Sequence, residues 1–172
     1  MADSRRYAFE GSEPEIASSA HVAHDAVLVG HVRVEADASV WPGTVLRGDI
    51  GPVRIDEQSH VGDNAVLHAS TVGERVMVGH SATLNDAVVG DGALVGFNAT
   101  VNSGVTVGEG SVVASGTVVP EEYHIPPESF ARGVPATVTP LSETTLDPDE
   151  IFSAHSSGAY TDLATRHQEL FE

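Results

Sequence analysis

The chain has 172 residues, enough for one domain with a substantial core and too few to expect two. It carries 25 acidic residues against 8 basic ones, all arginine, and a formal net charge of -17 would repel the phosphates of a nucleic acid. There is no cysteine, which excludes a disulfide framework and a thiolate metal site, so any metal must use histidine and oxygen ligands.

The acidic residues are dispersed through a valine-rich body in which 41% of the residues are hydrophobic. This composition favours a folded protein with an acidic surface over a disordered acidic tail. A high acidic charge with no lysine is what we expect of a protein that stays soluble in concentrated salt, because the salt screens the repulsion between its charges. We therefore expect a halophilic, cytoplasmic protein. The first fifteen residues contain no long apolar run, so we expect neither a secretory signal nor a membrane anchor.

Residues 16–120 form a repeat in which an aliphatic residue recurs at intervals of six, interrupted by "RGDIGP" at 47–52. Four residues after most of these aliphatic positions comes a small or β-branched residue. The aliphatic series is Val22, Leu28, Val34, Val40, Leu46, Ile55, Val61, Leu67, Val72, Val78, Leu84, Val89, Val95, Val101, Val107, Val113 and Val119; the second is Ala26, Val32, Ala38, Thr44, Ser59, Ala65, Val76, Ala82, Val88, Ala93, Ala99, Val105, Ser111 and Thr117.

A period of six fits neither a helix nor one long strand. It fits short strands separated by tight turns, with three sides making a triangular coil of about 18 residues. We therefore predict an all-β protein, a parallel β-helix of hexapeptide repeats with roughly five or six coils. An antiparallel β-sandwich is the alternative, but its turns would be less regular.

The composition changes after residue 120, first to a proline-rich segment and then to a polar stretch with helical spacing at Leu163, His167 and Leu170. Asp147 and Pro148 form an N-terminal capping pattern for a helix. We predict a β-helix domain over residues 1–141 and a C-terminal helical tail over 142–172 that packs on it.

The length of the repeat indicates which candidate site residues lie one above the other in neighbouring coils. His68 and Asn85 each follow an inward leucine and are 17 residues apart, so they should stack one coil apart, with backbones about 4.8 Å from each other. His80 and Asp63 are also 17 residues apart, nearer another corner. If His68 and His80 are to meet, the simplest way is across a groove between subunits.

Several segments carry a family resemblance: "SVWPGTVLRGDIGPVRI", "VGDNAVLHA", "VMVGHSATLNDAVVGDGALVGFNATV" and "PPESFARGVPA". Together they resemble the gamma-class carbonic anhydrases of the hexapeptide-repeat superfamily over about residues 20–141. The resemblance implies a left-handed β-helix, a homotrimer with zinc (or iron or cobalt) between subunits, and reversible hydration of carbon dioxide to bicarbonate.

Carried over by residue, the resemblance implies that His68 and His80 bind the metal, with His80 supplied by the neighbouring subunit. Asn85 stands where the family has its third metal histidine. Arg47, Asp49 and Asp63 match a salt-bridge network that holds the trimer and orients the site. The sequence departs from the family again at His60 and Gly62, where the family often has Asn and Gln.

These departures weaken the expected catalysis. An amide oxygen is a poorer zinc ligand than imidazole, and losing an orienting Gln removes a partner of the metal site. His60 is a possible replacement ligand. Two further functions stay open: an acyltransferase using acyl-coenzyme A with a groove histidine as general base, and a trimeric scaffold without activity.

Overall fold

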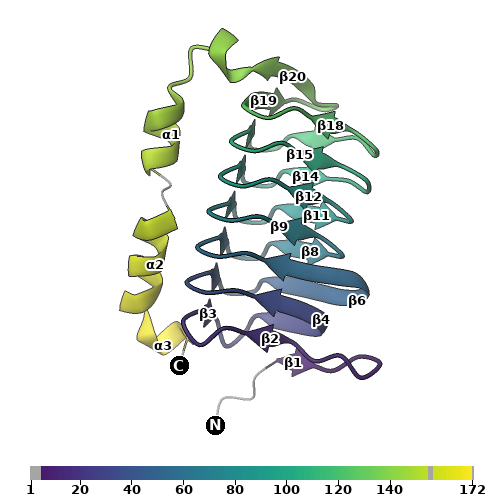
Figure 1. Ribbon diagram of the computed structural model, residues 1–172, viewed down its shortest axis with the longest axis vertical. Helices are drawn as coiled ribbons and strands as arrows, with labels where there is room; N and C mark the ends of the chain where they lie inside the picture. Colours follow the sequence, from purple (N-terminus) through teal and green to yellow (C-terminus); the bar gives the residue numbers. More distant parts are fainter. Residues whose placement is uncertain (1–4, 155–156, 172) are drawn as a thin grey trace.

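The computed structural model describes residues 5–154 and 157–171, which form a triangular prism with a helical segment along one side (Figure 1). An eight-stranded sheet makes one side of the prism. It contains β3 (His21–Val22), β5 (Ser39–Val40), β7 (His60–Val61), β10 (Met77–Val78), β13 (Leu94–Val95), β16 (Val112–Val113), β19 (Ser129–Arg132) and β20 (Thr137–Pro140).

A twelve-stranded sheet makes the other two sides. It contains β1 (Arg6–Tyr7), β2 (Glu15–Ile16), β4 (Val27–Val34), β6 (Val45–Ile55), β8 (Val66–His68), β9 (Thr71–Val72), β11 (Thr83–Asn85), β12 (Val88–Val89), β14 (Thr100–Val101), β15 (Thr106–Val107), β17 (Val118–Val119) and β18 (His124–Ile125). The long strand β6 pairs with β8 near its start and with β9 near its end, so it joins the two sides at a corner.

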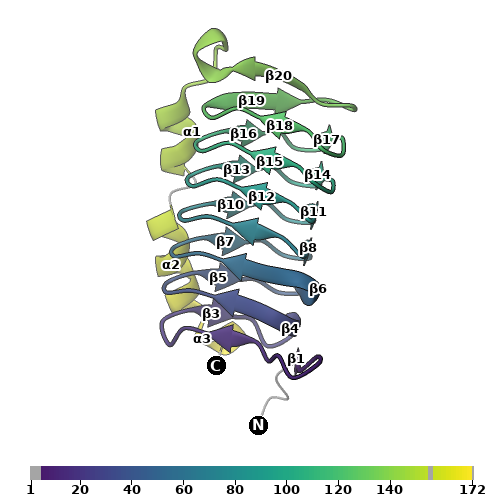
Figure 2. The same ribbon diagram turned by 45° about the vertical axis from the view of Figure 1, so that its right-hand side comes forward.

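The fold is the predicted left-handed β-helix, and it is longer than predicted. Neighbouring coils pair in parallel, and about seven coils stack before β20 turns back antiparallel to β19 (Figure 2). The repeat continues past residue 120, because Ile125 and Ala131 follow Val119 at the same interval and are fully buried. The prolines between them hid this continuation in the sequence.

The core is the ladder of inward residues that the period predicts. Every residue of the aliphatic series is buried, and the second series is buried with one exception. Val88 is 51% exposed and Ala87 takes its place at 1%. The reason is that the interval from Leu84 to Val89 is five residues instead of the usual six, as is the interval from Leu67 to Val72.

The helical segment comprises a 3-10 turn (Leu141–Glu143), α1 (Pro148–Ala154), α2 (Ser157–Arg166) and α3 (Gln168–Phe171). Asp147 caps α1 as predicted, since its Oδ1 accepts hydrogen bonds from the amides of Asp149 at 2.9 Å and Glu150 at 3.3 Å. His167 falls between α2 and α3, so the predicted helical spacing is split over two helices. None of the described helices is long and apolar enough to cross a membrane.

The segment runs back along the eight-stranded sheet toward the N-terminal coil (Figure 1). Trp41 anchors it, with ring contacts to Tyr160, His167 and Phe171 at centroid distances of 6.4, 6.0 and 5.3 Å. The division into domains at residue 141 stays a prediction, and residues 1–4, 155–156 and 172 lie outside the described part of those ranges.

Candidate functional site

Three of the predicted site residues form a ladder at the corner where β8 ends. Arg47 on β6 pairs in register with His68 on β8, and His68 pairs with Asn85 on β11. The stacking predicted by counting coils is therefore confirmed. Ala69 and Asp86 follow the ladder residues with φ of 51° and 47°, turning the chain sharply at this corner.

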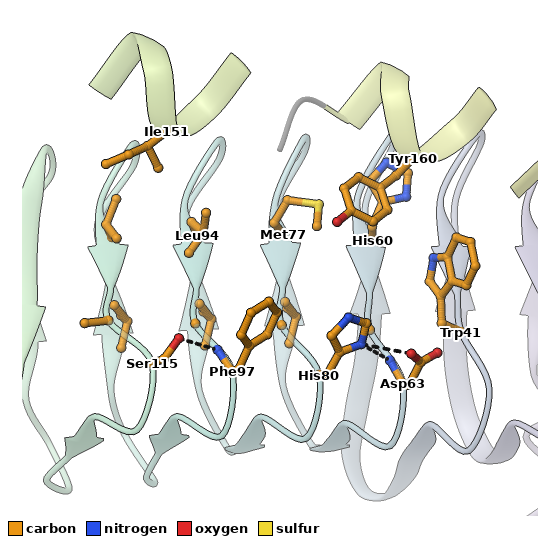
Figure 3. A pocket seen from close by; sticks show the side chains of 18 of the residues that line it. Trp41, His60, Asp63, Met77, His80, Leu94, Phe97, Ser115, Ile151 and Tyr160 are labelled. Atoms are coloured by element: carbon orange, nitrogen blue, oxygen red, sulfur yellow. Dashed lines mark hydrogen bonds and ion pairs between the residues drawn. The ribbon is translucent and has the colours of Figure 1, made fainter. Parts of the chain in front are cut away.

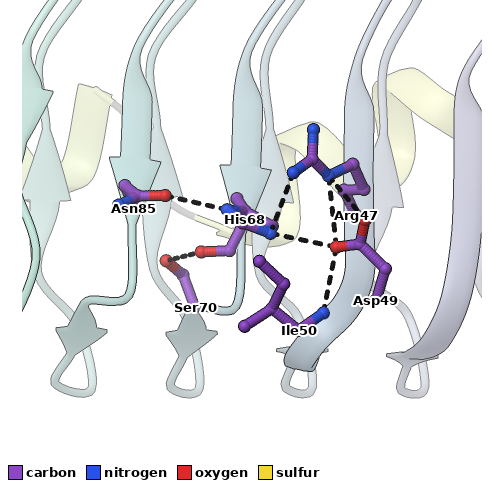
Figure 4. Close-up of polar contacts among 6 residues, drawn as sticks. All are labelled: Arg47, Asp49, Ile50, His68, Ser70 and Asn85. Carbon is purple, nitrogen blue, oxygen red and sulfur yellow. Dashed lines mark hydrogen bonds and ion pairs between the residues drawn. The ribbon is translucent and has the colours of Figure 1, made fainter.

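Hydrogen bonds connect this ladder to Asp49 (Figure 4). His68 Nε2 lies 3.0 Å from Asp49 Oδ1, and its Nδ1 lies 2.9 Å from Asn85 Oδ1. The Arg47 guanidinium reaches Asp49 Oδ2 at 3.0 Å and His68 Nε2 at 3.3 Å. Both ring nitrogens of His68 are thus engaged within one chain.

Asp49 is the electrostatic centre of the cluster. Desolvation raises the pKa of its carboxyl, but hydrogen bonds from Arg47, His68 and its own backbone, together with the Arg47 charge, lower it more. The net pKa lies below the usual value of 3.8, so Asp49 is an anion facing the His68 ring at neutral pH.

His80 lies at a different corner, after β10, together with Asp63 (Figure 3). Its Nδ1 is 3.0 Å from Asp63 Oδ2 and 2.9 Å from the Asp63 amide nitrogen. A single ring nitrogen can serve one of these at a time, donating to the carboxylate when protonated or accepting from the amide when not. When it donates, Nε2 has the lone pair that binds metals. The ring stacks on Phe97 at 5.2 Å.

A cavity of about 510 Å³ extends from His80 between the eight-stranded sheet and the helices (Figure 3). Its walls are mainly apolar, with Met77, Leu94 and Val112 from successive coils facing Ile151 and Leu163. Nothing in the sequence indicates this cavity, because it depends on how α1 and α2 lie over the sheet.

His60 lines the inner wall of the same cavity and is 1% exposed. Its Nδ1 is 2.5 Å from Ser39 Oγ, which in turn accepts a hydrogen bond from the Trp41 indole at 2.7 Å. The ring lies 5.4 Å from Tyr160. His60 belongs to the eight-stranded sheet, whereas His68 belongs to the other, so the structure does not bring it to the His68 cluster as a replacement ligand.

The predicted site residues therefore form two groups: Arg47, Asp49, His68 and Asn85 at one corner, and Asp63 and His80 at another. Within the described part of one chain, no group of three His, Asp or Glu side chains could hold a metal ion. His80 has Asp63 as a partner for Nδ1 and can offer Nε2 to a metal, whereas His68 can bind a metal through Nε2 only if that nitrogen leaves Asp49 and Arg47. Such a site needs a second subunit to be complete.

A family model for the bacterial transferase hexapeptide (six repeats) matches residues 86–121. Gamma carbonic anhydrase 1, mitochondrial, from Arabidopsis thaliana is 32% identical over 165 residues, covering 90% of this chain and 59% of the relative. The carnitine operon protein CaiE from Escherichia coli is 32% identical over 173 residues, covering 96% and 86%. A hexapeptide transferase family protein from Anaplasma phagocytophilum has a TM-score of 0.89 at 27% identity, covering 97% and 99%.

The chain spans 35% to 59% of the length of carbonic anhydrases from Geobacillus kaustophilus and Arabidopsis thaliana that it matches.

Proposed function

Because the chain belongs to the hexapeptide-repeat family that includes the gamma carbonic anhydrases, we propose that it catalyses the reversible hydration of carbon dioxide to bicarbonate. The active form is a homotrimer with a divalent metal, zinc or else iron or cobalt, at each subunit boundary. Each site combines His68 of one subunit with His80 of the partner subunit.

One observation carries this proposal, the ladder of Arg47, His68 and Asn85 in register beside Asp49. The ladder holds the His68 ring at a corner of the prism with its side chain 19% exposed. The His80 side chain is 50% exposed at another corner. Two imidazoles on separate corners can share one ion only when two subunits meet.

When bound, the metal supplies a Lewis acid that lowers the pKa of a water molecule to about 7. Asp63 holds His80 through Nδ1, and Arg47 with Asp49 holds His68 in place. The chain has no side chain at Gly62 to orient the reacting groups. With two imidazoles instead of three, we expect weaker metal affinity and slower turnover than a three-histidine site would give.

The test is carbon dioxide hydration by stopped flow, with metal content measured on untagged protein in concentrated salt. We expect hydration activity that depends on added zinc, and its loss in both His68→Ala and His80→Ala. Mixed trimers of these two variants should regain activity, because some boundaries then combine an intact His68 with an intact His80.

Zinc-loaded protein without hydration activity would contradict the proposal. Mixed trimers without activity would contradict the shared site. A monomeric protein, as measured by light scattering, would contradict both.

The cavity beside His80 favours an acyltransferase as the second candidate function. Its length over several coils and its apolar walls suit the acyl arm of a thioester, with His80 as general base. Acetyl-coenzyme A should then raise the melting temperature and protect His80 from chemical modification. An unchanged melting temperature would argue against this function.

A further inference from the structure

The cavity beneath α1 and α2 extends along the stack of coils (Figure 3). Its sheet side is a row of apolar side chains from successive strands that pair in register: Met77, Leu94, Val112 and Phe130. Neighbouring strands lie about 4.8 Å apart, so the row is about 14 Å long. A straight aliphatic chain laid along it would contact one side chain of the row in every coil.

The size and the second wall of the cavity also suit such a chain. Its volume of about 510 Å³ is typical of a small-molecule site. The side opposite the sheet is formed by Leu146, Ile151 and Leu163, which are all aliphatic. A chain between the two walls would therefore lose its contact with water on both sides.

One end of the cavity carries a negative charge. Among the described residues that line the cavity, Asp63 is the only one with a carboxylate, and none is an arginine. Its Oδ2 lies 3.0 Å from His80 Nδ1, and its side chain is 42% exposed. A carboxylate has about four acceptor sites on its two oxygens, so Asp63 can accept further hydrogen bonds beside the one that His80 can make.

The surroundings of Asp63 favour a cation over an anion. The rings of Trp41 and Phe97 line the same cavity, and the faces of aromatic rings attract ammonium groups. The formal net charge of -17 attracts cations to the protein and repels anions. A fatty acid would place its own carboxylate against Asp63, with no arginine in the described lining to pair with it.

We propose that this cavity binds an aliphatic ammonium ligand. The alkyl chain lies along the row from Met77 to Phe130, and the ammonium head donates hydrogen bonds to Asp63. This site goes beyond the proposed hydration of carbon dioxide and does not depend on it. It gives the cavity a cationic occupant in place of the acyl arm of the second candidate function.

The test titrates the full-length protein with linear primary amines from butylamine to decylamine, below the concentrations at which they form micelles. Met77 is one of two methionines in the chain, so ¹³C labelling of methionine methyl groups places a reporter in the cavity. We expect its resonance to shift, and the Kd to fall about fourfold with each added methylene group. Decanoate should bind roughly tenfold more weakly than decylamine, or worse, because of its opposite charge.

Asp63→Asn keeps the shape of the side chain and removes its charge, so it should weaken decylamine binding roughly tenfold. Asp91→Asn is the matched control, because it removes the same charge outside the cavity. The Asp91 Oδ1 accepts a hydrogen bond from the Glu74 amide at 2.9 Å, which asparagine can also accept. Its decylamine affinity should equal that of the wild type.

A further variant tests the path of the chain. Val112→Phe places a larger side chain in the middle of the row. The gain in affinity with chain length should then stop at a shorter amine than in the wild type, while butylamine binds as before.

Decanoate binding as tightly as decylamine would overturn the inference. Equal losses of affinity in Asp63→Asn and Asp91→Asn would also overturn it, because the overall charge alone would then explain the binding. The same holds for a Met77 methyl resonance that does not move at saturating decylamine, and for an affinity that does not depend on chain length.

Discussion

The Asp49 carboxylate receives hydrogen bonds from Arg47, His68 and its own segment of backbone, and these make its pKa lower than 3.8. Because the pKa of Asp49 is lower in the folded state, its ionised carboxylate stabilises the protein at pH values above the ordinary pKa of this side chain, 3.8. This contribution is lost as the pH falls through the lower, folded value. The cluster should therefore loosen in acid and not in base.

Asp49→Asn tests this pH dependence. The free energy of unfolding in urea should be lower in the variant than in the wild type by a constant amount above about pH 5. Below about pH 4 the difference should begin to shrink, because the carboxyl of the unfolded wild-type chain takes up a proton, and it should vanish once the pH falls through the lowered pKa of the folded state. A difference that is the same at both pH values would show that Asp49 acts through packing instead of charge.

Position 62 requires a glycine because the backbone of the next coil approaches it closely. A Cβ atom there would lie 2.9 Å from the backbone nitrogen of His80 and 2.9 Å from its Nδ1. The glycine therefore permits the contact between His80 and Asp63. A glutamine at position 62, the residue that the gamma-class carbonic anhydrases often have there, would meet the same backbone atoms.

We expect Gly62→Ala to destabilise the protein by about 1–3 kcal/mol, the usual cost of overpacking, and to shift the His80 ring resonances. Gly158→Ala is the control, because a Cβ there meets nothing within 4 Å and the residue lies in α2. That change should be neutral or stabilising by about 0.5–1 kcal/mol. Equal melting temperatures for Gly62→Ala and the wild type would contradict the steric account.

At the scale of elements, the helical segment depends on aromatic contacts with Trp41. This is the only tryptophan of the chain and is 9% exposed beneath α2 and α3. Its fluorescence therefore reports whether the helices lie on the sheet.

Replacing Tyr160 and Phe171 by alanine should release the helices and shift the tryptophan emission to longer wavelength, with the β-sheet circular dichroism retained. Tyr7→Ala, an exposed tyrosine on β1, is the control and should leave the emission unchanged. Unchanged emission in the double variant would mean that other contacts hold the helices.

The elements also show how far sequence reasoning extends. Counting residues predicted the prism, the buried ladder and the stacking of His68 with Asn85, because in a solenoid the register follows from the repeat length. It failed at Val88, where a side has one residue fewer, and at the coils after Pro120. The cavity and the hydrogen-bond partners of Asn85 depend on helix packing and side-chain rotamers, which the period does not encode.

At the scale of the whole molecule, acidic residues line one corner of the prism. Backbone amides bond to the carbonyls of Glu57, Glu74, Asp91 and Glu109, each from the coil above, so these four residues stack. Stacked coils lie about 4.8 Å apart, well inside the screening length of about 10 Å at 0.1 M salt. Glu74 is paired with Arg75 at 3.0 Å, but the other three carboxylates of the stack still place like charges close together in dilute solution.

We expect stability to rise with salt, by about 1 kcal/mol between 0.1 M and 1 M sodium chloride, where the screening length falls to about 3 Å. Glu57→Gln, Asp91→Asn and Glu109→Gln combined should reduce this salt dependence and raise the melting temperature in dilute salt. The same three changes made at Glu10, Glu13 and Asp149, outside the stack, are the control. A salt response equal in both triple variants would point to the overall charge, not to the stacked corner.

The return path of the helical segment has a consequence for how the chain acquires its structure. The Leu170 carbonyl accepts a hydrogen bond from the His24 amide at 3.0 Å, and the Phe171 ring packs against His21. A solenoid can add coils one after another as it is synthesised, since each coil needs only its predecessor. Here the N-terminal coil gains its contacts with α3 only after the last residues of the chain have been synthesised. The edge of the eight-stranded sheet near β3 therefore stays uncovered throughout synthesis of the prism.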